Sequence, residues 1–63
     1  MSHAEAQRVH IEMRAALDNA FTVRIRQING SESVIRVTHM TRKGQTDLAT
    51  RDAAALFLRQ ALA

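Results

Sequence analysis

The fold of this chain is decided by residues 21–40, which read FTVRIRQINGSESVIRVTHM. In the first part of this stretch every second side chain is apolar, as in a β-strand that buries one of its faces. Asn29 and Gly30 then mark a turn, and a second alternating segment covers residues 33–40. The stretch is therefore predicted to form a β-hairpin with strands at residues 21–28 and 33–40.

The two faces of these strands restrict how they pair. A two-residue loop at Asn29-Gly30 would pair apolar residues with charged ones, which a sheet with one buried face does not tolerate. A three-residue loop over 29–31 instead pairs Ile25 with Ile35 and keeps the faces separate. We expect that register, and a five-residue loop with the same faces remains open.

A helix is predicted on each side of the hairpin. Residues 3–20 show helical periodicity, with Ser2 as the N-cap and Glu5 three positions later. A basic loop at 41–45 precedes a second helix at about 47–62. Thr46 is the expected cap of that helix, and Thr50 is the alternative. The apolar faces comprise Ala6, Val9, Met13, Ala16, Leu17 and Ala20 in the first helix, and Ala54, Phe57, Leu58, Ala61 and Leu62 in the second.

These elements predict an α+β fold, helix–β-hairpin–helix (αββα), in a single small domain of residues 1–63. The chain has 63 residues and no Cys, so a small core must hold without a disulfide. Oligomerisation is a common way to stabilise such a small fold. We expect a homodimer in which two hairpins form a four-stranded antiparallel sheet covered by helices on one face. Ile11 and Leu56 lie off the apolar helix faces and are the expected dimer or partner contacts.

The net charge of +3 is concentrated in the hairpin and the loop that follows it. Residues 22–43 hold five cations against Glu32 alone. In the expected register Arg24 lies opposite Arg36, and like charges at such a pair destabilise a sheet unless an anion relieves them. The predicted binding residues for an anionic partner are Arg24, Arg26, Arg36, Thr38, Arg42 and Lys43.

Two partner classes match this basic face. Arg side chains can form bidentate hydrogen bonds with phosphate, and a two-stranded β-ribbon can enter the major groove of DNA. The first expectation is therefore a non-enzymatic module that binds duplex nucleic acid. Only Phe21 and Phe57 are aromatic, which disfavours recognition of single strands by stacking. The alternative is a small regulator or inhibitor that docks an acidic protein through the same face or through Ile11 and Leu56.

No pattern for catalysis, a metal or a cofactor stands out. His3 and His10 lie two helical turns apart, too far to share one ion. His39 is expected to be a half-buried packing residue opposite Phe21. No apolar run is long enough for a signal peptide or a membrane span. We expect a soluble, cytoplasmic protein that is not an enzyme and does not contact a membrane.

Residues 50–62 are loosely similar to the Ala-rich final helix of double-stranded RNA-binding domains, and the first helix and hairpin occur in a similar order. That family has three strands, and its last helix begins with a Lys-rich phosphate clamp. Here two strands are predicted, and Asp52 follows Arg51. We therefore assign the chain to no family.

Overall fold

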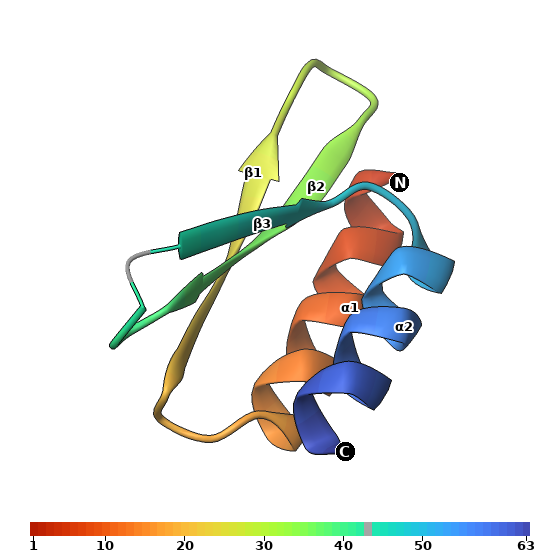
Figure 1. Cartoon of the computed structure of the whole chain (residues 1–63). Helices are drawn as coiled ribbons and strands as arrows, with labels where there is room; N and C mark the ends of the chain where they lie inside the picture. The colour runs from red at the N-terminus through yellow and green to blue at the C-terminus, as the bar shows by residue number, and fades with distance from the viewer. Residues whose placement is uncertain (43) are drawn as a thin grey trace.

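The computed structural model describes residues 1–42 and 44–63 and contains one antiparallel sheet and two helices. The elements are α1 (His3–Ala16), β1 (Phe21–Gln27), β2 (Ser33–His39), β3 (Gly44–Leu48) and α2 (Arg51–Leu62). The strand order is β1-β2-β3. Both helices cover the same face of the sheet and run side by side in the same direction (Figure 1). The α+β class is confirmed, with three strands where two were predicted.

The hairpin has the expected register. Ile25 pairs with Ile35 and Val23 with Val37, so the apolar faces of β1 and β2 coincide. β1 ends at Gln27 and β2 begins at Ser33, so residues 28–32 connect the strands, as in the five-residue loop that keeps the same faces. Within this loop the N–H of Ile28 donates to the carbonyl of Glu32 at 2.9 Å. The alternation of apolar and polar residues was sufficient to predict this register, because a shift of one residue would bury arginines.

The third strand corrects the sequence-based prediction for residues 41–50. Residues Gly44–Leu48 pair with β2 rather than forming a loop and the start of a helix. Of this strand only Leu48 is buried, and it pairs with Ile35. A single apolar residue in five gives almost no alternation, so the sequence signal for this strand is weak.

The helix ends also differ from the prediction in an informative way. Ser2 caps α1 by accepting a hydrogen bond from the N–H of Glu5 at 3.1 Å, as expected. The helix ends at Ala16 rather than residue 20, and the Asp18 carboxylate then accepts the N–H of Ala20 at 2.9 Å. An aspartate that binds the backbone two residues on favours a turn over a continuing helix.

Thr50 is the N-cap of α2, and its hydroxyl accepts the N–H of Ala53 at 3.1 Å. The alternative cap is therefore the observed one, and Thr46 lies in β3 instead. Ala54 is buried and Phe57 half-buried, but Leu62 at the end of α2 is exposed. The apolar face of this helix is thus shorter than predicted.

The core lies between the sheet and the two helices and draws on every element. Its buried members are Ala6, Val9, Met13, Leu17, Val23, Ile35, Val37, Leu48 and Ala54. Phe21 and Phe57 pack at its margin with their ring centroids 5.9 Å apart. No helix among residues 1–42 and 44–63 is long and apolar enough to cross a membrane.

Candidate binding face of the sheet

The face of the sheet that carries no helix is called the open face below. Alternation along the paired strands places the same set of side chains on it throughout. The open face consists of Thr22, Arg24, Arg26, Val34, Arg36, Thr38, Gln45 and Asp47. Three of the predicted binding arginines and Thr38 are therefore brought together on one surface, opposite the helix layer.

Asp47 on β3 offsets the electrostatic repulsion expected between Arg24 and Arg36. Asp47 pairs with Arg36 in the register, and its two carboxylate oxygens accept from Nε and Nη2 of Arg36 at 2.9 and 3.2 Å. These hydrogen bonds raise the pKa of Arg36 and lower the pKa of Asp47, and the nearby positive charge of Arg26 lowers the latter further. Asp47 thus belongs to the open face, whereas the sequence suggested a role at a helix start.

The lowered pKa of Asp47 predicts a specific loss of stability in acid. A carboxyl group whose pKa is lower in the folded chain stabilises the fold above its ordinary pKa, near 3.9, and that contribution disappears as the pH falls through the folded value. The urea midpoint of the wild type, followed by circular dichroism, should therefore fall below about pH 4. Asp47→Asn should lack this component, so the two curves should converge in acid.

Asp18→Asn is the matched control for this measurement, because an amide oxygen can still accept the N–H of Ala20. It should keep the acid dependence of the wild type. An Asp47→Asn profile parallel to that of the wild type would show that the pair with Arg36 does not form in solution.

Arg24 and Arg26 remain as the cations of the open face that have no ion pair within the described residues. Both are exposed, and they lie two residues apart on β1. Alternate residues of a strand are about 6.6–6.8 Å apart, so their guanidinium groups can reach anions spaced along an extended chain. Thr22 and Thr38 are half-buried neighbours and pair with each other.

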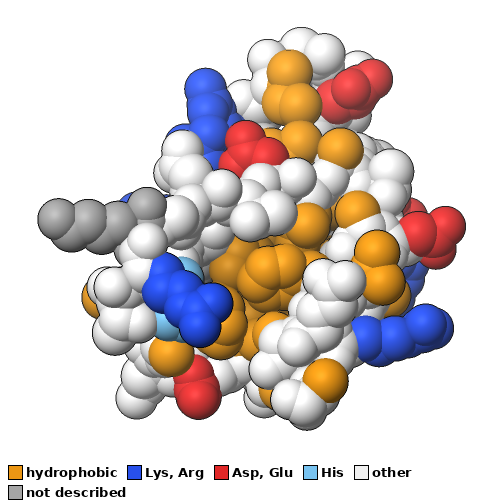
Figure 2. Space-filling view, viewed as in Figure 1, with side chains coloured by type: hydrophobic (Ala, Val, Ile, Leu, Met, Phe, Trp, Pro, Cys, Tyr) orange, Lys and Arg blue, Asp and Glu red, His pale blue; other side chains and the backbone are white. Residues whose placement is uncertain are grey.

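Arg42 does not lie on the open face. Arg42 lines a hollow between β3 and α2, together with Phe57 and Gln60. Figure 2 shows hydrophobic side chains gathered in this hollow, with a basic side chain at its rim. Lys43 lies outside the described residues. The structure therefore does not bring Arg42 together with Arg24 and Arg26.

The two predicted apolar contacts are both on the surface. Ile11 on α1 is 68 % exposed and Leu56 on α2 is 54 % exposed. Neither belongs to the core or packs against it as a partly buried residue. They are available to a partner on the helix side of the molecule, away from the open face.

Two histidines have structural roles, of which the sequence indicated only the packing of His39 against Phe21. The Nε2–H of His10 donates to the carbonyl of Val23 at 3.0 Å, because a carbonyl can only accept. His39 makes an edge-to-face contact with Phe21, as its predicted packing role requires. Its Nδ1 also accepts the N–H groups of Thr41 and Arg42, each at 3.2 Å, so it organises the turn after β2.

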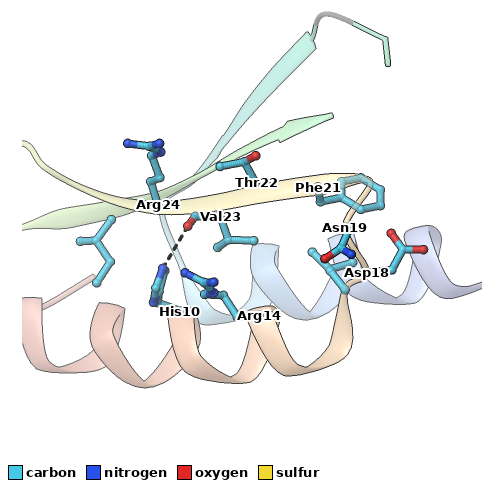
Figure 3. Close-up of a pocket in the computed structure, with 10 residues that line it drawn as sticks. His10, Arg14, Asp18, Asn19, Phe21, Thr22, Val23 and Arg24 are labelled. Atoms are coloured by element: carbon cyan, nitrogen blue, oxygen red, sulfur yellow. Dashed lines mark hydrogen bonds between the residues drawn. The ribbon is translucent and has the colours of Figure 1, made fainter. Parts of the chain in front are cut away.

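A second hollow runs along the free side of β1. It has a volume of about 590 Å³ and lies between α1 and β1, with His10 and Arg14 rising from the helix towards the strand (Figure 3). Arg24 points away on the other side of β1, while Val23 and Phe21 form part of the wall. The edge of β1 is therefore flanked by basic side chains from both layers.

Comparison with known proteins leaves the chain without an assigned family. The three strands remove one difference from double-stranded RNA-binding domains, but the basic clamp at the start of the last helix is missing, since exposed Asp52 follows Arg51. No protein-family model, curated protein or solved structure matches this sequence.

Proposed function

We propose that this chain is a small non-enzymatic binding module that docks an acidic protein partner through Arg24 and Arg26. The observation that carries this proposal is the engagement of Arg36 by Asp47, which leaves two neighbouring cations on β1. Guanidinium groups form bidentate hydrogen bonds with carboxylates. Two of them at the spacing of alternate strand residues suit an extended segment with carboxylates at alternate positions.

Duplex nucleic acid is the competing candidate, and it depends on a larger set of cations. Each phosphate contact contributes about 0.9 to the slope of log affinity against log salt concentration. Arg24 and Arg26 alone would give a slope of about −1.8, far below that of typical specific binders. Binding of duplex nucleic acid would therefore require Arg36, Arg42 and Lys43 to contact phosphates as well.

The two candidates are separated by a direct binding measurement. Labelled poly-L-glutamate, duplex DNA and duplex RNA are titrated with the protein at low and moderate salt, and fluorescence anisotropy is recorded. Poly-L-glutamate should bind, and Arg24→Gln combined with Arg26→Gln should weaken it by about three- to tenfold. Duplex binding that is tighter, with a salt slope beyond about −4, would replace the acidic partner by nucleic acid.

A matched variant controls for the change in the net charge of the protein. Arg8 and Arg59 are exposed on the helices, away from the open face. Arg8→Gln combined with Arg59→Gln lowers the net charge from +3 to +1, as the open-face pair of changes does. Affinity for poly-L-glutamate should be unchanged in this variant. Equal weakening in both double variants would end the proposal.

A homodimer remains part of the proposal, with Ile11 and Leu56 as its contacts. The four-stranded sheet expected from two hairpins is not retained, because the described residues of each chain form three strands. We expect light scattering to give twice the chain mass of 7.0 kDa. Ile11→Glu combined with Leu56→Glu should return the particle to a single chain, because charged groups are excluded from a dry interface. A wild-type particle of one chain would remove the dimer and leave the acidic-partner proposal intact.

A further inference from the structure

The edge strand β1 has backbone groups that no other strand among residues 1–42 and 44–63 uses. In an antiparallel pair, successive residues alternately face the partner strand and point away from it. The carbonyl of Ala20 accepts from Met40 and the N–H of Ile28 donates to Glu32, so the even-numbered residues of this segment face β2. The odd-numbered residues of β1 therefore point their N–H and C=O groups outward.

The contact of His10 agrees with this assignment and limits the free edge. The outward carbonyl of Val23 is occupied by Nε2–H of His10 at 3.0 Å. The N–H of Phe21 is also used, since it donates to the carbonyl of Asp18 at 3.2 Å. The free part of the edge therefore begins at the N–H of Val23 and includes both backbone groups of Ile25 and Gln27.

The surroundings of this edge are basic and concave. Arg24 and Arg26 project on the open face beside it. On the helix side, His10 and Arg14 line the hollow between α1 and β1, and its apolar part is formed by Leu17, Val23 and Ile25. Asp18 and Asn19 lie at the end of this hollow near Phe21 (Figure 3). An added strand would thus place alternate side chains beside arginines and the others over this hollow.

We infer that the free edge of β1 accepts an extended acidic peptide as a fourth strand of the sheet. This inference rests on the proposed function and names how the acidic partner binds. Backbone hydrogen bonds to Val23, Ile25 and Gln27 supply the register, as in other cases of strand addition. Acidic side chains at alternate positions of the peptide contact Arg24 and Arg26, and the intervening apolar ones cover the hollow.

The positive charge beside the β1 edge favours an acidic peptide over a second copy of the chain. Two β1 edges pairing antiparallel would bring Arg24 and Arg26 of one copy beside the same residues of the other, in any register centred on this strand. Like charges on neighbouring strands destabilise the pair. An acidic strand reverses the sign of that interaction, so the edge suits a foreign acidic segment rather than itself.

The test uses the wild-type protein and a capped peptide of about seven residues in which Glu and Val alternate. Binding is measured by anisotropy and by amide chemical shifts. On binding, hydrogen exchange should slow at the N–H groups of Val23, Ile25 and Gln27, which have no strand partner in the free chain. The same peptide with Lys in place of Glu should bind at least about tenfold more weakly.

N-methylation of the peptide separates strand addition from simple attraction of charges. Only every second peptide N–H faces β1 in an added strand. Methylation of the set that faces β1 should lower affinity about tenfold or more, whereas methylation of the alternate set should have little effect. Equal effects of the two patterns, or unchanged exchange at the three amides, would overturn the inference.

The outcome also distinguishes this inference from the function on which it rests. Loss of poly-L-glutamate binding in the Arg24→Gln and Arg26→Gln variant, combined with tolerance of both methylation patterns, would leave an acidic partner on the open face without strand addition. Absence of binding to both the peptide and poly-L-glutamate would remove the two proposals together.

Discussion

Replacing Ile35 by Ala is expected to remove a large part of the free energy of unfolding at 25 °C. Ile35 is fully buried in the central strand, between Ile25 on β1 and Leu48 on β3. Truncation of such a side chain to Ala costs about 2–5 kcal/mol. The whole fold, at about 0.05–0.15 kcal/mol per residue, has only about 3–9 kcal/mol to lose.

The chain contains a matched control for this change. Ile28 lies just beyond β1 and is 58 % exposed. Ile28→Ala should alter the free energy of unfolding by no more than about 0.5 kcal/mol. Urea unfolding followed by far-ultraviolet circular dichroism is the appropriate measurement, because the chain has no Trp or Tyr to report by fluorescence. Similar urea midpoints for the two variants would contradict the central position of Ile35.

Leu48→Ala is expected to have the second largest effect, a loss of about 2–4 kcal/mol. Leu48 is the single buried side chain of β3, so its truncation removes the main apolar contact between this strand and the core. The pair of Asp47 with Arg36 should weaken along with it, because β3 positions the carboxylate. Thermal unfolding by circular dichroism, with amide exchange at Thr46 and Leu48, measures both consequences.

Leu62→Ala controls for the chemistry of this substitution. Leu62 ends α2 and is 62 % exposed, so its removal should change stability by about 0.5 kcal/mol or less. Should Leu48→Ala prove as mild as Leu62→Ala, residues 44–48 would not form a strand packed on the core, and the predicted loop and helix start would regain support.

Local patterns were enough to predict the hairpin and the start of α1, and they gave the start of α2 only as an alternative. The register follows from the alternation in residues 21–40, since a shift of one residue would exchange the buried and exposed faces. Ser2 was identified as a cap, and Thr50 as an alternative cap, by hydroxyl groups placed just before helical segments. The grouping of Arg24, Arg26 and Arg36 on one face required nothing beyond the same alternation.

The candidate site was only partly predictable, because its charge balance depends on a distant residue. Asp47 is eleven positions from Arg36, and it reaches the open face only because Gly44–Leu48 forms a strand. The hydrogen bond from His10 to Val23 likewise joins a helix to a sheet edge. Neither contact produces a local sequence signal, since periodicity describes an element and not its neighbours.

The sequence by itself determined the α+β class, the register of β1 with β2 and the face on which three arginines lie, because these depend on alternation between adjacent residues. Tertiary structure decided that β3 exists, that Arg36 is engaged by Asp47 and that the edge of β1 remains free. The physical reason is that a strand with one apolar side chain gains its stability from pairing with β2 and from burial of Leu48 against Ile35, and both are long-range interactions.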